Sequence, residues 1–432
     1  MSLDVNASII TIGDELLIGQ TIDTNSAFIA QELNKIGVWV HRKVAVGDSW
    51  GDIWQALDTE GKQSQIIIIT GGLGPTADDI TKPLLCKYFG GKMITNEKVL
   101  DHIKYLFEKV YRRSGPILER NLKQADVPDV CTVLHNARGS APGMWFEKPL
   151  SDLSKRRGSH NTVFISLPGV PHEMKGLMTS EVIPRLLNTF VLPAIIHKTA
   201  FTAGQGESYI AERLISFEAS LPPHIKLAYL PNYGMVKLRL TSKGTDKDSL
   251  DAELQPYFDQ LQMLVKEWLV TDSDEGLEIV VGRILKSKQK TVGTAESCTG
   301  GYIAHLITSI AGSSAYYKGS IISYANEVKE NLLNVSHDTL VKHGAVSQET
   351  VTEMVKGAIK ELHVDYAVAV SGIMGPDGGS EEKPVGTVWI ATGNIEKTET
   401  LKLNLRFDRQ RNIAITAMNA LNFLRRFVLS NG

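Results

Sequence analysis

Short, almost entirely apolar segments that run directly into glycine-rich loops are the strongest constraint on the fold of this chain. Residues 66–70 are Ile-Ile-Ile-Ile-Thr and precede a loop that opens with Gly71, and residues 365–370 precede a second such loop at 371–380. Segments of this length and composition predict strands buried on both faces, as in parallel sheets. Ligands bind beyond the carboxyl ends of such strands, so these loops are candidate sites.

A third strand is predicted at residues 8–12, and it leads into an acidic loop at 13–20. Asp14 and Glu15 in this loop form one acidic pair, and Asp78 and Asp79 form a second pair after the strand at 66–70. Brought together at one sheet edge, the two pairs could hold a divalent cation against a pyrophosphate. The alternative for Asp78 or Asp79 is a helix N-cap. A helix is predicted next to the first loop from apolar residues that share one face: Phe28, Ile29, Leu33 and Ile36.

Residues 295–301, Ala-Glu-Ser-Cys-Thr-Gly-Gly, indicate a turn between a strand and a helix. The helix is expected to start near 299–301, because apolar residues then recur at helical spacing. Its unpaired N–H groups would seat a phosphate or a developing oxyanion, and Gly300 and Gly301 would let a ligand approach the backbone. An amidase-type site is the leading hypothesis for this region.

Each candidate nucleophile or base in this region has a purely structural alternative. Ser297 could serve only to make the turn. Lys329 could be a solvated charge on a helix, since only burial beside a serine would lower its pKa enough for a base. Cys298 has no histidine within 295–301 to generate a thiolate, so we interpret it as a packed small residue. The loop at 371–380 could be a flexible connector.

The motifs at 295–301, 312–318, 323–329, 343–347, 371–380 and 383–388 resemble, in order and spacing, those of the PncC family of nicotinamide mononucleotide deamidases. The resemblance covers about 160 residues through Gly432. The resemblance implies that a serine attacks the carboxamide of nicotinamide mononucleotide. The hydrolysis yields nicotinate mononucleotide and ammonia and needs no cofactor. Carried over by motif, Ser314 is the nucleophile and Lys329 its base, with Tyr324 and Ser297 as neighbours that orient or relay the proton. The implied substrate-binding residues are Thr299, Gly300, Gly301, Ser371, Gly372, Gly375, and Arg409 or Arg411 for the phosphate.

The amino-terminal segments, together with motifs at 121–125, 136–143 and 167–174, resemble the molybdopterin-binding fold of MoaB and MogA and the amino-terminal part of the CinA family. In that family the domain is linked to metal-dependent hydrolysis of ADP-ribose. The resemblance implies a divalent metal, Mg, Mn or Co, held by Asp14, Glu15, Asp78 and Asp79. It implies a nucleotide held by Gly13, Asn25, Gly71, Gly72, Gly74, Thr76 and Lys82.

The middle of the chain is the least informative part. Residues 226–230 and 235–241 alternate as a hairpin, and 256–269 is expected to be a helix with Pro256 in its first turn. This segment resembles the KH-like linker of CinA, but no basic face interleaved with aromatic residues supports RNA binding. Residues 151–161 are expected to be a solvated loop.

We therefore predict an α/β protein with two three-layer α/β domains, at 1–175 and 271–432. Their sheets are expected to be mostly parallel, and a small α+β, KH-like segment at 176–262 joins them. A chain of 432 residues is long enough for each of these domains to have its own core. A net charge of −2 gives no overall positive potential that would attract polyanions. Three widely spaced cysteines and the absence of a long apolar run indicate a cytoplasmic protein without disulfides or membrane spans. No signal peptide is apparent.

The predicted function is a bifunctional hydrolase acting on nicotinamide mononucleotide and ADP-ribose, expected to be a homodimer with no membrane or nucleic-acid partner. One alternative is a regulatory protein that binds a nucleotide or a pterin and carries a degenerate amidase domain. The other, a DNA-uptake factor, is opposed by the lack of a basic stripe.

Overall fold

The structure, a computed structural model, describes residues 5–76, 79–112, 115–148 and 162–431. The chain divides into two compact units, one comprising residues 1–196 with 243–251 and the other comprising 197–242 with 252–432. Two features predicted above, the loop at 151–161 and the carboxylate of Asp78, lie outside the described residues.

A mixed sheet forms the centre of the first unit, and its six described strands follow the order β2-β1-β3-β8-β7-β6. The pairs β2/β1, β1/β3 and β3/β8 are parallel, whereas β8/β7 and β7/β6 are antiparallel. The strands span Asn6–Ile12 (β1), Trp39–Val46 (β2), Ile66–Thr70 (β3), Thr132–Leu134 (β6), Gly143–Lys148 (β7) and Thr162–Leu167 (β8). A separate small ladder pairs Met93–Thr95 (β4) with Asp126–Pro128 (β5).

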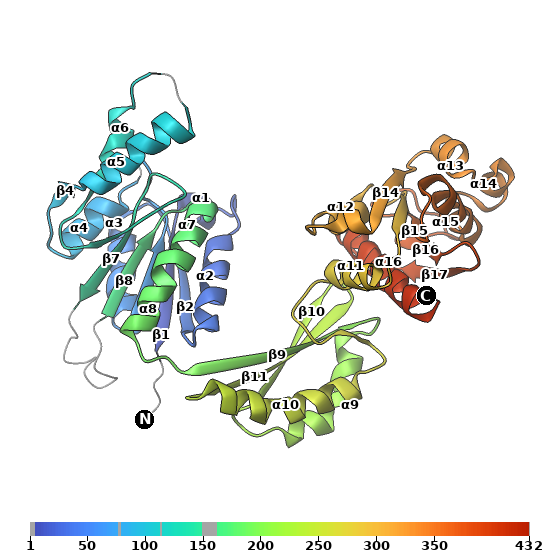
Figure 1. Ribbon diagram of the computed structural model, residues 1–432, viewed down its shortest axis with the longest axis horizontal. Coiled ribbons are helices and arrows are strands. Elements are labelled where there is room, and N and C mark those ends of the chain that lie inside the picture. Colours follow the sequence, from blue (N-terminus) through green and yellow to red (C-terminus); the bar gives the residue numbers. More distant parts are fainter. Residues whose placement is uncertain (1–4, 77–78, 113–114, 149–161, 432) are drawn as a thin grey trace. The chain divides into compact units, whose positions relative to one another are not determined.

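Helices cover both faces of this sheet, which gives three layers (Figure 1). Successive side chains of β3 point to opposite faces of the sheet and pack against different helices. Ile66 and Ile68 pack with α2, α7 and α8, while Ile67 and Ile69 pack with α3 and α4. The predicted strands at 8–12 and 66–70 are thereby confirmed. The helices span Asp14–Leu17 (α1), Thr24–Lys35 (α2), Trp50–Gly61 (α3), Thr81–Tyr88 (α4), Glu97–Tyr105 (α5), Glu119–Leu122 (α6), Pro171–Leu177 (α7) and Ile183–Thr189 (α8).

The helical segment that begins at Pro171 continues through the expected domain boundary at 175/176. A π-helical turn, Met178–Val182, joins α7 to α8. Met178, Val182 and Leu186 are all fully buried in the core of the first unit. The core of the first unit therefore extends beyond residue 175.

The KH-like segment has a four-stranded described sheet in the order β10-β11-β9-β12. The predicted hairpin is confirmed as antiparallel β10 and β11. The elements span Ala194–Ala203 (β9), Glu207–Ser220 (α9), Lys226–Asn232 (β10), Met235–Gly244 (β11), Lys247–Leu264 (α10) and Leu269–Thr271 (β12).

The helix expected at 256–269 is wrong in both bounds, because α10 starts at Lys247 and contains Pro256 in its interior. The side chain of Asp246 accepts a hydrogen bond from the Ser249 N–H at 2.9 Å and so caps the helix upstream of the proline. Apolar packing of Leu254 and Leu261 then outweighs the hydrogen bond that Pro256 cannot donate.

The carboxyl-terminal part of the second unit has a five-stranded described sheet in the order β14-β13-β15-β16-β17. Pairs β14/β13 and β13/β15 are parallel, but β15/β16 and β16/β17 are antiparallel, so this sheet is mixed rather than mostly parallel. The strands span Val292–Glu296 (β13), Tyr317–Ile322 (β14), Tyr366–Gly372 (β15), Thr387–Gly393 (β16) and Thr398–Asn404 (β17).

This sheet too lies between two helical layers. Val368 and Val370 pack with α11, α12 and α16, whereas Ala367 and Ala369 pack with α13, α14 and α15. The alternation of valine with alanine lets α15 approach one face closely. The helices span Leu277–Ser287 (α11), Tyr302–Thr308 (α12), Asn326–Leu333 (α13), His337–His343 (α14), Gln348–Leu362 (α15) and Arg409–Ser430 (α16).

Candidate functional site

Three loops meet where the parallel strands of the carboxyl-terminal sheet end. Ser297 follows β13, Ser323 follows β14, and Ser371 lies near the end of β15. A cavity of about 200 Å³ opens at this edge. It is lined by Ser297, Cys298, Tyr324, Lys329, Ala345, Val346, Ser371, Gly372, Met374 and Arg409.

Lys329 is the chemically decisive side chain of this cavity. It lies on α13 and is only 1% exposed. Its Nζ contacts Ser297 Oγ at 3.2 Å and also donates to the backbone carbonyls of Ser323 at 2.7 Å and Tyr324 at 3.3 Å. These partners are neutral oxygens, and burial lowers the pKa of Lys329 from its ordinary value. Lys329 is thus a buried amine beside a serine, not a solvated charge.

The serine beside Lys329 is Ser297 and not Ser314, which corrects the assignment carried over by motif. Ser314 is exposed, in a 3-10 turn (Ser313–Ala315) before the amino end of β14. Lys329 follows the carboxyl end of the same strand, and six residues of extended chain span roughly 17 Å. Within one chain, Ser314 therefore lies at the opposite edge of the sheet from the cavity.

Cys298 lines the cavity but is not a nucleophile. Its side chain is 6% exposed, and burial raises the pKa of the thiol to about 12, so it carries its proton at neutral pH. The interpretation of Cys298 as a packed small residue agrees with this geometry.

The predicted start of α12 near 299–301 is confirmed, but its N-terminus is not free to bind an anion. Glu296, fully buried at the end of β13, accepts hydrogen bonds from the N–H groups of Gly301, Ile303 and Ala304 at 2.8–3.1 Å. It also accepts from the Thr299 hydroxyl at 2.7 Å. A carboxylate of the protein itself therefore occupies the positive end of this helix. Thr299, Gly300 and Gly301 do not line the cavity.

Glu296 is a functional candidate that the sequence reasoning missed. The sequence did contain a signal for Glu296. It places a single carboxylate at the end of a β-branched segment and directly before a glycine-rich helix start. Burial of such a carboxylate costs free energy unless backbone N–H groups donate hydrogen bonds to it. The backbone of Gly301 adopts φ +98°, a left-handed conformation that favours glycine and ends the turn.

The two arginines that were candidates for binding the phosphate, Arg409 and Arg411, have different surroundings in the structure. Arg409 lines the cavity, donating from Nη1 to the Gly375 carbonyl at 2.9 Å and from Nη2 to the Tyr324 hydroxyl at 3.2 Å. Arg411 instead stacks over Phe407, with its guanidinium carbon 4.1 Å from the ring centroid. Ser371 is buried, and its hydroxyl donates to the Ala345 carbonyl at 2.7 Å, so it supports the cavity wall.

In the first unit, a cavity of about 110 Å³ lies at the carboxyl ends of β1 and β3. Glu15 and Asn25 line it. Asn25 Nδ2 donates to Thr70 Oγ1 at 3.1 Å and to the Gly169 carbonyl at 2.7 Å, while its buried Oδ1 has no partner among the described residues. Gly13 closes the adjoining loop with its N–H bonded to the Val46 carbonyl at 3.1 Å.

The glycine-rich loop after β3 is held by Asp79. One carboxylate oxygen of Asp79 accepts from the Gly74 N–H at 2.7 Å, and the other accepts from the Thr76 N–H at 2.8 Å and the Thr76 hydroxyl at 2.5 Å. At Gly71, φ +117°, a Cβ would collide with the Ile12 carbonyl, so the chain needs glycine there, and Gly72 is also left-handed at φ +62°. The structure thus gives Asp79 a loop-bracing role.

The predicted four-carboxylate metal centre is not assembled by the described residues. Asp14 accepts from the Asp48 N–H at 3.2 Å, Asp79 is used by its own loop, and Asp78 lies outside the described ranges. In the described part of the chain, no group of three or more His, Cys, Asp or Glu side chains could hold a metal ion. Lys82 does not line the cavity at β1 and β3, and its buried Nζ donates to the Gln124 carbonyl at 2.6 Å.

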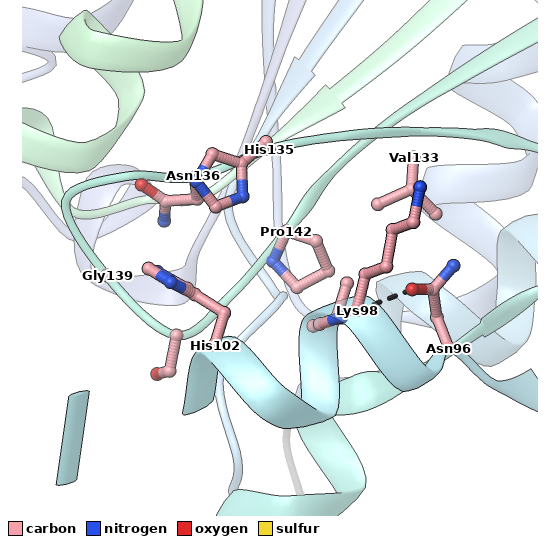
Figure 2. A pocket seen from close by; sticks show the side chains of 10 residues that line it. Asn96, Lys98, His102, Val133, His135, Asn136, Gly139 and Pro142 are labelled. Carbon is pink, nitrogen blue, oxygen red and sulfur yellow. Dashed lines mark hydrogen bonds between the residues drawn. The ribbon is translucent and has the colours of Figure 1, made fainter. Parts of the chain in front are cut away.

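A second cavity of the first unit, about 340 Å³, lies between α5 and the loop before β7 (Figure 2). The imidazoles of His102 and His135 meet edge to face there, with ring centroids 4.7 Å apart. Burial, and then the charge of His135, lower the pKa of His102. None of the candidate site residues predicted from the sequence lines this cavity, but Asn136, Gly139, Ser140 and Pro142 belong to the motif at 136–143.

Comparison with known proteins agrees with this architecture. The "CinA C-terminal domain" family matches residues 274–428, the "Damage-inducible protein CinA KH domain" family matches 197–270, and the "Probable molybdopterin binding domain" family matches 8–188. A CinA-like protein of Cytophaga hutchinsonii is 46% identical over 426 residues, which cover 99% of each chain. The chain belongs to the CinA family.

A second relative gives the same assignment, and a solved structure is also similar in sequence. A CinA-like protein of Flavobacterium psychrophilum is 45% identical over 428 residues, again covering 99% of each chain. The crystal structure of the competence damage-inducible protein A from Klebsiella pneumoniae is 35% identical, with a TM-score of 0.35, and covers 36% of this chain and 97% of that chain. Among the described residues, no helix is both long enough and apolar enough to cross a membrane.

Proposed function

We propose that the carboxyl-terminal domain hydrolyses the carboxamide of nicotinamide mononucleotide, with Ser297 as nucleophile and Lys329 as its base. The observation that carries this proposal is the 3.2 Å contact between Ser297 Oγ and a lysine amine that is 1% exposed. A buried amine without a carboxylate partner favours its neutral form, which is the form able to accept a proton. The resemblance to the PncC deamidases supplies the substrate.

The first half of the reaction acylates the enzyme. Ser297 Oγ attacks the carboxamide carbon while its proton passes to Lys329 Nζ, which gives a tetrahedral intermediate and a protonated lysine. Lys329 then returns this proton to the amide nitrogen as the carbon–nitrogen bond breaks. Ammonia leaves, and the nicotinoyl group remains as an ester on Ser297.

The second half releases the acid. Water attacks the ester carbon and gives one proton to Lys329, which passes it to Ser297 Oγ as the ester bond breaks. Nicotinate mononucleotide leaves, and the serine and the neutral lysine are restored. The positioned lysine therefore acts as base and as acid in each half-reaction.

Arg409 supports a phosphorylated substrate. Its guanidinium reaches the cavity from the start of α16 and is already oriented by the Gly375 carbonyl and the Tyr324 hydroxyl. A planar guanidinium can meet a phosphate with two parallel hydrogen bonds. Tyr324, which is 65% exposed, would then lie between the reacting end and the phosphate end of the ligand.

Ammonia release from nicotinamide mononucleotide by the purified full chain tests the proposal. Ser297→Ala and Lys329→Met should each lower turnover by about a thousandfold or more. Ser314→Ala is the matched control, because it removes the same hydroxyl at the opposite sheet edge and should leave turnover near the parent value. Activity should also survive EDTA. A normal rate in Ser297→Ala would overturn the assignment.

For the first unit, we propose nucleotide binding at the carboxyl ends of β1 and β3, with cleavage of ADP-ribose as its reaction. Asn25 lines this cavity with Glu15, and its buried Oδ1 has no partner among the described residues, which supports a ligand there that donates a hydrogen bond, such as a ribose hydroxyl. Asn25→Ala should weaken ADP-ribose binding in calorimetry and leave ammonia release unchanged. Unchanged ADP-ribose affinity would contradict this second proposal.

A further inference from the structure

A cavity of about 560 Å³ lies where the KH-like segment meets the carboxyl-terminal domain within the second unit. These two parts share one core, in which Phe201 of β9 and Met235 of β11 are buried together with Ala417 and Leu421 of α16. The cavity has no lining residue in common with the cavity that holds Lys329. It is therefore a separate cavity, and its volume is in the range of pockets that bind small molecules.

Tyr233 lines this cavity from a strained turn. Strands β10 and β11 pair Asn232 with Met235, so the turn between them consists of Tyr233 and Gly234 only. Both turn residues have a positive φ, +47° and +80°, as a type I′ turn requires. Asparagine and glycine adopt this conformation readily, whereas a tyrosine does so at a cost in free energy. Strain of this kind, at a residue that lines a cavity, is typical of binding sites.

A second tyrosine lines the same cavity. Tyr302 is the first residue of α12, and its side chain, like that of Tyr233, is partly exposed. Exposed aromatic rings in a cavity offer flat faces on which a planar ring can stack. Gln410 also lines the cavity, and its amide can both donate and accept hydrogen bonds at the edge of such a ring. The cavity therefore suits a nucleobase.

Arg411 supplies a positive charge to this cavity. Its guanidinium stacks on Phe407 by one face, which leaves the N–H groups at its edge for a ligand such as a phosphate. In the described part of the chain, this guanidinium has neither a hydrogen-bond nor an ion-pair partner. Asp408 also lines the cavity and caps α16 by accepting from the Arg411 N–H at 2.9 Å. An acidic side chain of this kind can accept hydrogen bonds from ribose hydroxyls.

We propose that this cavity binds a nucleoside 5′-monophosphate, with the base against Tyr233 and Tyr302 and the phosphate at Arg411. The inference is independent of the deamidase proposal, because no residue of the cavity that holds Lys329 takes part. An extended nucleic-acid strand would need a basic groove along its backbone, whereas Arg411 is the only lysine or arginine among the described residues that line this cavity. One cation is sufficient for one phosphate.

Photolabelling of the full chain with 8-azidoadenosine 5′-monophosphate, followed by mass spectrometry of its peptides, tests the site. Label is expected on the peptides that contain Tyr233 or Tyr302, and AMP should protect them. Tyr233→Asn should lower this labelling about tenfold or more, the loss expected for one stack of a base on an aromatic ring. Tyr111→Asn is the matched control and should label like wild type, because Tyr111 is 46% exposed against 45% for Tyr233 and does not line the cavity.

The choice of asparagine separates a loss of binding from a folding defect. Asparagine adopts the left-handed conformation more readily than tyrosine, so Tyr233→Asn should keep or raise the thermal midpoint of the protein. Arg411→Gln should remove the preference for AMP over adenosine as the protecting ligand, because the phosphate loses its partner. Equal labelling of Tyr233→Asn and wild type, or label confined to peptides outside this cavity, would overturn the proposal. Protection by single-stranded RNA but not by AMP would overturn it as well.

Discussion

Lys329 Nζ lies 3.2 Å from Ser297 Oγ although the two residues are 32 positions apart in the chain. The contact exists because β13 and β14 are parallel neighbours, so the residues that follow their carboxyl ends meet at one edge. Both groups are withdrawn from solvent, with Ser297 8% and Lys329 1% exposed. Burial favours the neutral amine, and the neighbouring hydroxyl gives that amine a proton to take.

The pH dependence of deamidation should follow Lys329. Burial lowers its pKa from the ordinary value, and only the neutral amine acts as base. The rate constant kcat/KM should therefore rise with pH and level off above the lowered pKa, instead of continuing to rise towards the pKa of a free lysine. A profile of kcat/KM from pH 5 to pH 10 measures this. A rate that is flat across the range would contradict a lysine base.

Glu296 should be essential for the local fold of the turn. Glu296→Ala leaves the N–H groups of Ile303 and Ala304 without an acceptor, which should lower the free energy of unfolding by about 1–3 kcal/mol. Urea denaturation of the full chain, followed by hydrogen exchange of the α12 amides, provides the measurement. Glu327→Ala, an exposed carboxylate on α13, is the control and should change stability by less than about 0.5 kcal/mol.

Arg409 and Arg411 should differ in their effect on substrate binding. Arg409→Gln should raise KM for nicotinamide mononucleotide about 10- to 100-fold, the loss expected for a charge-assisted bond to phosphate, and should change KM for nicotinamide riboside much less. Arg411→Gln is the matched control, because that guanidinium lies over Phe407. Equal losses on both substrates in Arg409→Gln would assign this arginine to folding.

Lys82 should make the stability of the first unit depend on pH. Burial lowers its pKa to about 8, below the ordinary value of 10.5, so between these values the unfolded chain binds more protons than the folded one. Stability should therefore rise as pH increases from about 8 to 10.5, by up to about 3 kcal/mol for a shift of this size. Hydrogen exchange of the β3 amides in wild type and Lys82→Met across this range isolates the contribution. Equal pH slopes in the two proteins would show that Lys82 titrates normally.

Local patterns in the sequence were sufficient to predict many of the strands and helices. The all-apolar segment at 66–70 and the segment at 365–370 are strands because only a sheet covered on both faces can bury such residues. The start of α12 followed from apolar spacing after two glycines. The end of the first unit and the start of α10 did not, because burial of Met178 and packing of Leu254 depend on elements distant in sequence.

The chemistry of the site depended on information that no local pattern contains. The sequence by itself determined the residue types, namely serines and a lysine beside glycine-rich turns, and the turn that carries Ser297. Only the tertiary structure decided that Ser297 and not Ser314 faces Lys329, that Glu296 fills the start of α12, and that Arg409 and not Arg411 reaches the cavity. The physical reason is that strand order and register set these contacts, and they bring together side chains that lie tens of residues apart.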